Sequence, residues 1–118
     1  MENYFVDMTD SFDMEEDNVE IPFTVEVPEG EIDLEWVTDI VTRVTAMHLD
    51  MEVEDVSPTK RFQQDLNADS LDIVEINMKL EKMLDISVPD YYIGLIITVD
   101  DAARVIQKVL NEEPEEEN

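Results

Sequence analysis

Apolar residues in the middle of the chain recur at three and four positions in three separate stretches, the spacing of one face of an α-helix. The first stretch predicts a helix over about 33–48, with Asp33 as its N-cap and the pattern Val37, Ile40, Val41, Val44 and Met47. The second predicts a helix over about 70–85, and the third a helix that begins at Thr98. These periods predict an all-α fold, a small bundle of three to four helices.

The connections between these stretches differ in length. A long loop from Leu49 to Asp69, interrupted by Ser57-Pro58-Thr59, separates the first two helices, and Val88-Pro89 ends the second. The segment 90–97 is a weak helix candidate, because Gly94 costs a helix about 1 kcal/mol relative to alanine. We therefore expect this segment to be short and mobile, with aromatic side chains available for contacts.

The acidic residues divide the chain into a folded middle and two arms. Residues 1–30 hold ten acidic residues and no basic one, whereas Trp36 to Leu110 hold 14 acidic and all seven basic residues. We expect 1–31 to be an acidic, disordered extension, 32–110 a helical bundle, and 111–118 an acidic, disordered tail. Within the extension, 19–27 partly alternates like a strand, but Pro22 would interrupt a central ladder, so we expect it to be disordered or loosely docked.

The composition excludes several classes of function. A formal net charge of −25 excludes nucleic-acid binding, which depends on Lys and Arg at phosphates, and favours a monomer. The chain has no cysteine and therefore no thiol nucleophile, and its two glycines are too few for a glycine-rich phosphate loop. The single histidine also argues against most kinds of acid-base catalysis. The longest apolar run, 91–97, is far shorter than the roughly 20 residues of a membrane-spanning helix. With no signal-peptide pattern at the N-terminus, we expect a cytoplasmic protein that is not an enzyme.

Ser70 is the candidate for covalent chemistry, although a serine at a helix start is usually only a capping residue. The sequence supplies no neighbouring base that would make it a hydrolase nucleophile. As an attachment point it is well placed, because free N–H groups at a helix N-terminus accommodate a phosphodiester. His48 is interpreted as a cation at the C-terminus of the first helix. The acidic run after Leu49 departs from a calcium loop at Asp55 and Arg61, so no dedicated metal site is predicted.

The sequence around Ser70 resembles the acyl carrier protein family, in a run that reads Phe62-Gln63-Gln64-Asp65-Leu66-Asn67-Ala68-Asp69-Ser70-Leu71-Asp72-Ile73-Val74-Glu75. The resemblance continues through Leu80-Glu81, Ile86-Ser87-Val88-Pro89-Asp90 and Ile97-Thr98-Val99, and covers about 32–110. It implies that a phosphopantetheinyl transferase attaches 4′-phosphopantetheine from coenzyme A to Ser70. The thiol of that arm would hold an acyl group as a thioester for acyl-transferring, condensing or acyl-ligase enzymes of fatty-acid or specialised lipid biosynthesis.

The resemblance also implies roles for residues around the serine. Acidic side chains at the start of the second helix and along it match positions that basic patches of partner enzymes recognise: Asp69, Asp72, Glu75 and Glu81. We expect two tyrosines of the segment 90–97, Tyr91 and Tyr92, to belong to the same recognition surface. Apolar side chains match the surroundings of the arm and the acyl-chain pocket: Val41, Phe62, Leu71, Val74, Ile76, Met78 and Ile96. Apolar packing of a bundle core explains the same side chains equally well.

Three departures from the family pattern, together with the unusual acidic N-terminal extension, indicate a specialised carrier. Asn67 stands where glycine is usual, although asparagine tolerates a left-handed backbone. Lys79 and Lys82 add positive charge to the second helix, and 90–97 is aromatic and aliphatic rather than acidic. Two alternatives stay open, a peptidyl or polyketide carrier and an unmodified acidic adaptor protein. The acidity and the Asp before the serine favour the acyl carrier.

Overall fold

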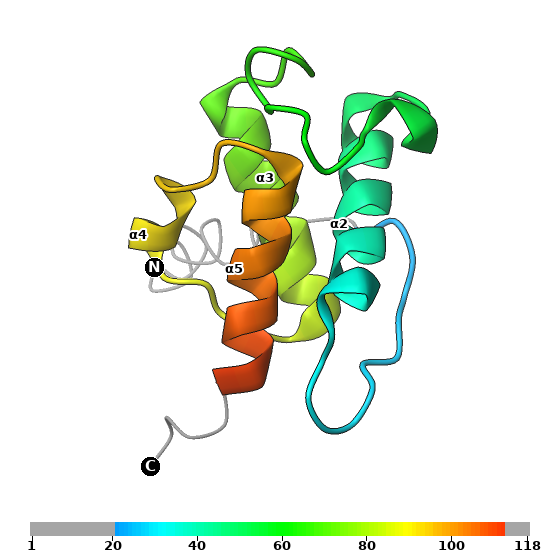
Figure 1. Ribbon diagram of the computed structural model, residues 1–118, viewed down its shortest axis with the longest axis vertical. Helices are drawn as coiled ribbons and strands as arrows, with labels where there is room; N and C mark the ends of the chain where they lie inside the picture. The colour runs from blue at the N-terminus through cyan, green and yellow to red at the C-terminus, as the bar shows by residue number, and fades with distance from the viewer. Residues whose placement is uncertain (1–20, 113–118) are drawn as a thin grey trace, which may run out of the picture.

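The computed structural model describes residues 21–112, and in this part of the chain the expected helices are present and no β-strand is formed. The elements are α2 (Leu34–Leu49), the short 3₁₀-helix η1 (Val53–Asp55), α3 (Ser70–Leu84), α4 (Asp90–Ile93) and α5 (Val99–Glu112). This arrangement confirms the predicted small all-α bundle with a long first connection (Figure 1). Among the described helices, none combines the length and the apolar character that crossing a membrane requires.

The helix ends are set by short-range hydrogen bonds from polar side chains. Asp33 caps α2, because its Oδ1 accepts a hydrogen bond from the Trp36 N–H at 3.0 Å. Thr98 does the same for α5, where its Oγ1 accepts from the Asp101 N–H at 3.0 Å. At the other end of α2, Asp50 adopts a left-handed conformation with φ 59°, which turns the chain away. The predicted starts of these two helices are therefore confirmed by their capping geometry.

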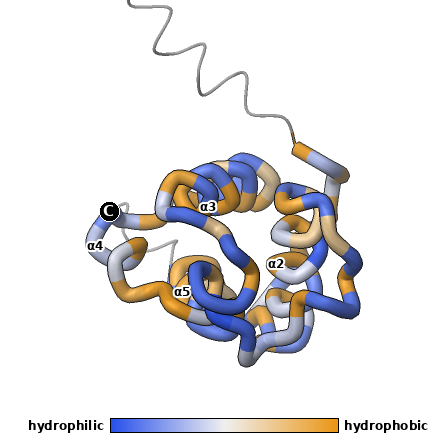
Figure 2. The backbone as a smooth tube through the Cα atoms, turned by 90° about the horizontal axis from the view of Figure 1, so that it is seen from above, coloured by the Kyte–Doolittle hydropathy of each residue, from blue (hydrophilic) through white to orange (hydrophobic). Residues whose placement is uncertain are grey.

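The three longer helices stand around a shared apolar interior. α2 packs against both α3 and α5, while α4 lies at the edge of the bundle away from α2 (Figure 2). The largest side chains that are almost completely buried come from all parts of this interior: Phe62, Leu80, Ile106, Val37, Val41, Val44, Val56 and Val99. Met47 was expected on the apolar face of α2, and this was wrong, since 56% of its surface is exposed. Met47 lies in the last turn of α2, between buried Ala46 and half-buried His48, and its side chain faces solvent.

The connection between α2 and α3 is anchored rather than loose. Phe62, with 1% of its surface exposed, inserts into the core from this loop. Its N–H donates to the Ile97 carbonyl at 2.9 Å, and the Val99 N–H donates to the Lys60 carbonyl at 3.0 Å. These bonds attach the loop to the start of α5, and the loop crosses one end of the bundle before it reaches Ser70 (Figure 1).

The segment before α2 contacts the bundle without forming a helix or strand. Ile21, Phe23 and Val25 are partly buried against the core, and the Arg43 guanidinium lies 5.8 Å from the centre of the Phe23 ring. Residues 1–20 of the expected extension lie outside the described residues, as do 113–118 of the expected tail. At the C-terminal end, α5 continues to Glu112, two residues into the segment expected to be a tail.

Candidate functional site

Ser70 is the first residue of α3 and its surface is exposed. Its two acidic neighbours form a reciprocal capping box across it. The Asp72 N–H donates to Asp69 Oδ1 at 2.9 Å, and the Asp69 N–H donates to Asp72 Oδ2 at 3.1 Å. Both carboxylates therefore stabilise the start of the helix, and the serine hydroxyl stands at the positive end of the helix dipole.

The chain reaches Ser70 through a tightly held turn. Asn67 has φ 60°, the left-handed conformation that the sequence suggested asparagine would tolerate in place of glycine. On either side of it, Leu66 and Ala68 are buried, with 6% and 2% of their surfaces exposed. The Ala68 N–H donates to the Phe62 carbonyl at 2.8 Å. The position of the serine is thus fixed by the core on one side and by the helix cap on the other.

The electrostatics at the start of α3 favour ionised carboxylates. The backbone N–H of Asp69 lowers the pKa of the Asp72 carboxyl below its usual value, and the hydrogen bond from His48 lowers it further. Asp72 is therefore ionised at neutral pH. No side chain that could act as a base is hydrogen-bonded to Ser70 among the described residues. The arrangement accordingly suits a hydroxyl that another enzyme modifies.

His48 takes part in a cluster that the sequence did not reveal. It lies in the last turn of α2 as predicted, but its ring reaches across to α3. Nε2 lies 3.2 Å from Asp72 Oδ1 and 3.3 Å from Glu75 Oε1, while Nδ1 lies 2.9 Å from Lys79 Nζ. The only sequence signal was the spacing of the three α3 residues, which places them on one helix face. Which residue they would meet depended on how α2 and α3 pack.

The residues expected to recognise partners differ in their exposure and in the contacts that they make within the chain. Asp69, just before α3, and Glu75 are exposed, although Asp69 belongs to the capping box and Glu75 lies 3.3 Å from His48 Nε2. Asp72, the other member of the capping box, is half-buried. Glu81 is also half-buried, and its Oε2 accepts from the Val88 N–H at 2.6 Å, so it braces the turn after α3. Further along, α4 carries Tyr91, which is 68% exposed and whose ring lies beside that of Tyr92, with centroids 4.6 Å apart and planes tilted by 38°.

The residues expected around the acyl chain also separate into two groups. Four are core residues with 8% or less of their surface exposed: Val41, Phe62, Ile76 and Ile96. In contrast, Leu71 and Val74 are 61% and 39% exposed on the first turns of α3, next to Ser70, and Met78 is half-buried. The structure therefore brings Leu71 and Val74 to the attachment site and places the first four in the packed interior.

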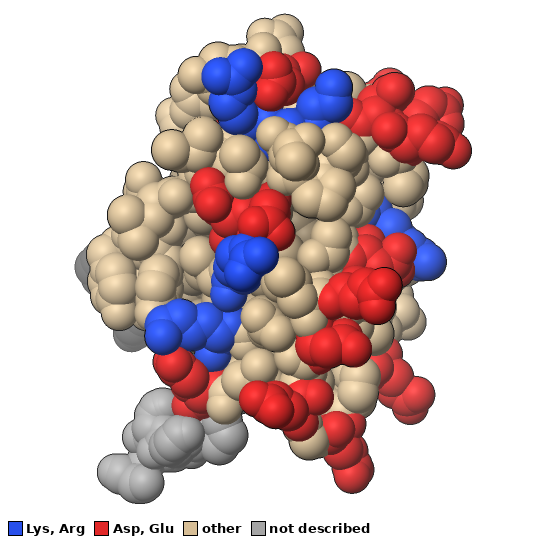
Figure 3. Space-filling view, viewed as in Figure 1, with Lys and Arg blue, Asp and Glu red and all other residues tan. Residues whose placement is uncertain are grey.

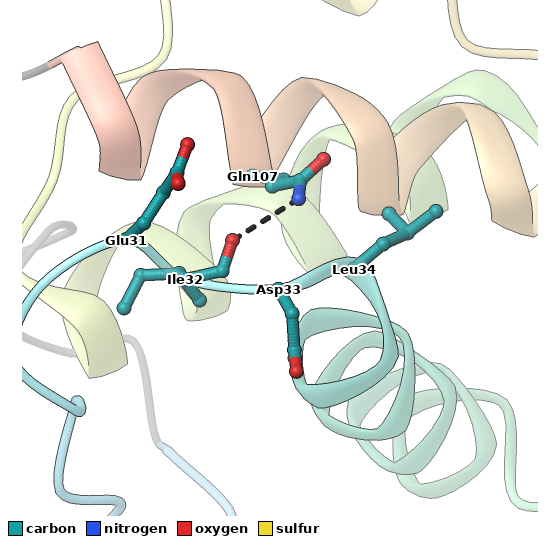
Figure 4. A pocket seen from close by; sticks show the side chains of 5 residues that line it. All are labelled: Glu31, Ile32, Asp33, Leu34 and Gln107. Atoms are coloured by element: carbon teal, nitrogen blue, oxygen red, sulfur yellow. Dashed lines mark hydrogen bonds between the residues drawn. The ribbon is translucent and has the colours of Figure 1, made fainter.

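A pocket of about 270 Å³ lies elsewhere, between the start of α2 and α5 (Figure 4). It is lined by Glu31, Ile32, Asp33, Leu34 and Gln107, none of which was expected to line an acyl-chain site. Inside it, Gln107 Nε2 donates to the Ile32 carbonyl at 3.0 Å. The pocket marks the place where the segment before α2 is held against α5.

The charges on the face shown in Figure 3 are unevenly distributed. Acidic side chains gather along the edge formed by α2, whereas the surface over α4 carries no charged side chain on this face. The large exposed apolar residues in and after α4 are Tyr91, Leu95 and Ile97. The two sides of the bundle, the α2 edge and the α4 side, therefore offer different contacts, the first electrostatic and the second apolar.

Two comparisons with known proteins agree with this geometry. Residues 35–106 match the family model described as a phosphopantetheine attachment site. The chain is also 41% identical over 71 residues to a protein of Sulfurovum sp. (strain NBC37-1) named acyl carrier protein, a match that covers 60% of this chain and 95% of that relative. The range matched by the family model begins in α2, ends in α5 and includes Ser70.

Proposed function

The chain belongs to the acyl carrier protein family, and we propose that Ser70 is the residue at which it carries its prosthetic group. Members of this family are carriers of 4′-phosphopantetheine and not enzymes. When bound, the group supplies a thiol that holds an acyl chain as a thioester. The observation that supports Ser70 is its exposed hydroxyl at the first position of α3, on a backbone held by the core and by the capping box.

The acidic neighbours of Ser70 are compatible with an anionic phosphodiester at this position. Asp69 and Asp72 each direct a carboxylate oxygen to a backbone N–H of the other, at 2.9 and 3.1 Å. These bonds offset part of their negative charge, and the helix N-terminus adds positive potential. A phosphopantetheinyl transferase would supply the chemistry, because no base within residues 21–112 is hydrogen-bonded to the serine.

We further propose that partner enzymes approach the face around Ser70. Exposed Asp69 and Glu75 would meet basic side chains of a partner, which speeds encounter more than it strengthens the complex. Leu71 and Val74 would add apolar contact beside the arm, and α4 would contribute Tyr91 in place of charge. Short-lived contacts of this kind suit a carrier that must visit several enzymes.

The acyl group is proposed to be a fatty-acyl chain or the acyl chain of a specialised lipid. Val41, Phe62, Ile76 and Ile96 contribute apolar side chains to an interior that is mostly apolar and chemically suited to an aliphatic chain. Because interiors are close-packed, the helices would have to separate for the chain to enter. We propose that the protein works in the cytoplasm. We also propose that it is a monomer, since its net charge of −25 opposes self-association.

The proposal for Ser70 is tested by intact-mass measurement of the full chain after incubation with coenzyme A and a phosphopantetheinyl transferase. The unaltered chain should gain the mass of one phosphopantetheinyl group, and Ser70→Ala should gain none. Ser87→Ala, which removes another exposed serine just after α3, is the matched control and should be modified fully. If the unaltered chain stays bare while a known carrier in the same tube is modified, the adaptor function is favoured instead.

Loading of the modified protein distinguishes the carrier classes. Fatty-acyl, aminoacyl and polyketide thioesters would be offered with their respective loading enzymes, and the product measured by mass. Preferential fatty-acyl loading is the expected result. Preferential aminoacyl or polyketide loading would favour the peptidyl or polyketide alternative.

A further inference from the structure

Three side chains that can ligate metals meet where the end of α2 faces the first turns of α3. They are His48, Asp72 and Glu75, and one ligand atom from each lies within 4.8 Å of the other two. His48 Nε2 is 3.2 Å from Asp72 Oδ1 and 3.3 Å from Glu75 Oε1. The cluster is mixed, with one nitrogen and two oxygen donors, and it brings together two helices.

Two of the three ligand separations are close to those of a tetrahedral metal site. Zinc binds histidine nitrogen and carboxylate oxygen at about 2.0–2.2 Å, so two ligand atoms on a tetrahedron are separated by about 3.3–3.6 Å. The two Nε2–carboxylate distances, 3.2 and 3.3 Å, lie at the short end of this range, and the two carboxylate oxygens, which lie within 4.8 Å of each other, would move together on binding an ion. We propose that His48, Asp72 and Glu75 bind a divalent first-row transition metal ion, with Zn²⁺ as the reference ion.

The carboxylate of Asp72 is already oriented for this role. Its Oδ2 accepts the Asp69 N–H at 3.1 Å, which leaves Oδ1 directed at His48. Hydrogen bonds of this kind orient metal ligands and are typical of natural sites. An ion bound here would join the end of α2 to α3 only two residues from Ser70.

The cluster is open on one side. The side chains of His48, Asp72 and Glu75 are 12%, 31% and 47% exposed, so the histidine is largely covered while the carboxylates face solvent. An ion can therefore enter from solvent, and a water molecule can complete a fourth position. The imidazole nitrogen favours Zn²⁺, Ni²⁺ or Cu²⁺ over Mg²⁺ and Ca²⁺, which prefer oxygen ligands alone.

Lys79 opposes binding in a way that can be measured. Its ammonium Nζ lies 2.9 Å from His48 Nδ1 and can only donate, so in the metal-free cluster Nδ1 accepts and Nε2 carries the proton. A metal at Nε2 moves the ring proton to Nδ1, where it faces the ammonium. Glutamine at this position would instead offer an oxygen that accepts the Nδ1–H. Lys79→Gln should therefore bind the metal more tightly than the unaltered chain.

The test is calorimetric titration of the full chain with Zn²⁺ in excess Ca²⁺, which occupies the exposed acidic side chains. We expect one zinc equivalent, with affinity reduced at least about tenfold in His48→Gln and in Glu75→Gln. Lys79→Gln should increase the affinity about tenfold, the usual size of effects from residues behind a metal ligand. Glu75 is an exposed side chain, so its replacement tests the site without disturbing the core.

Two results would overturn the proposal. If His48→Gln and Glu75→Gln bind Zn²⁺ as tightly as the unaltered chain, the ion is held by acidic residues elsewhere. If Lys79→Gln binds no more tightly than the unaltered chain, Nε2 is not the ligand atom. Co²⁺ in place of Zn²⁺ gives a second measurement, since its visible spectrum should lose the nitrogen contribution in His48→Gln.

Discussion

Replacing Asn111 with alanine should destabilise the bundle by about 1–3 kcal/mol, the cost of leaving a buried donor without a partner. Asn111 is near the end of α5, and its side chain holds the backbone of Ile32, just before α2. The Ile32 N–H donates to Asn111 Oδ1 at 2.8 Å, and Asn111 Nδ2 donates back to the Ile32 carbonyl at 3.2 Å. Ile32 itself is 4% exposed while Asn111 is exposed, so these hydrogen bonds are partly shielded from water.

Gln107 provides the matched control for the size of this effect. Its Nε2 donates to the same Ile32 carbonyl at 3.0 Å (Figure 4). In Gln107→Ala the carbonyl keeps its bond from Asn111, so the loss should stay below about 1 kcal/mol. In Asn111→Ala the Ile32 carbonyl keeps its hydrogen bond from Gln107, but the Ile32 N–H loses its only partner among the described residues. Asn111→Ala should therefore lower the free energy of unfolding more than Gln107→Ala does.

The measurement is urea and thermal unfolding of the full chain, followed by circular dichroism. For a domain of this size, 1 kcal/mol corresponds to a change of about 4–8 °C in Tm. Equal melting of the two variants, or a larger loss in Gln107→Ala, would refute the reasoning. Either result would mean that the Ile32 N–H does not depend on Asn111.

Three further predictions concern charge. Although partial burial raises the pKa of Asp101, hydrogen bonds from the Thr98 and Ile97 N–H groups lower it below its usual value. Its ionised form thus stabilises the fold above the unfolded-state pKa of about 3.9, and Asp101→Asn should lower Tm at pH 7 but progressively less as the pH falls below that value. Asp85→Asn should raise the free energy of unfolding, measured in urea, by about 0.3–1 kcal/mol. The substitution removes a negative charge from the C-terminal end of α3 and keeps a side chain that tolerates φ 57°. Added salt should raise the Tm of the unaltered chain, because 14 acidic residues face seven basic ones between residues 36 and 110.

Each of these has an opposite result that would count against it. A Tm difference between Asp101→Asn and the unaltered chain that persists undiminished at pH 2 would show that the hydrogen bonds, not the charge, stabilise the start of α5. Earlier unfolding of Asp85→Asn would show that its carboxylate has a favourable partner. A salt-independent Tm would mean that the charges are too widely spaced to repel one another.

The sequence alone determined the features that depend on near neighbours. Apolar periods of three and four residues gave the three longer helices, and Asp33 and Thr98 marked two of their starts through bonds to residues three positions later. The run of residues around Ser70 is equally local, so its resemblance to the acyl carrier protein family, and with it the candidate attachment point, could be found without the fold. Local hydrogen bonds and helical spacing involve few residues, which is why a linear pattern reveals them.

Only the tertiary structure decided which distant residues meet and which apolar side chains are covered. His48 and Asp72 are 24 positions apart, and Ile32 and Asn111 are 79 apart. Leu71 shares the apolar pattern of α3 yet is 61% exposed, whereas Ile73 in the same turn is buried, because only one face of this turn packs against the rest of the bundle. Helical spacing says which side chains share a face, but burial and long-range hydrogen bonds depend on the angle and distance at which the helices pack.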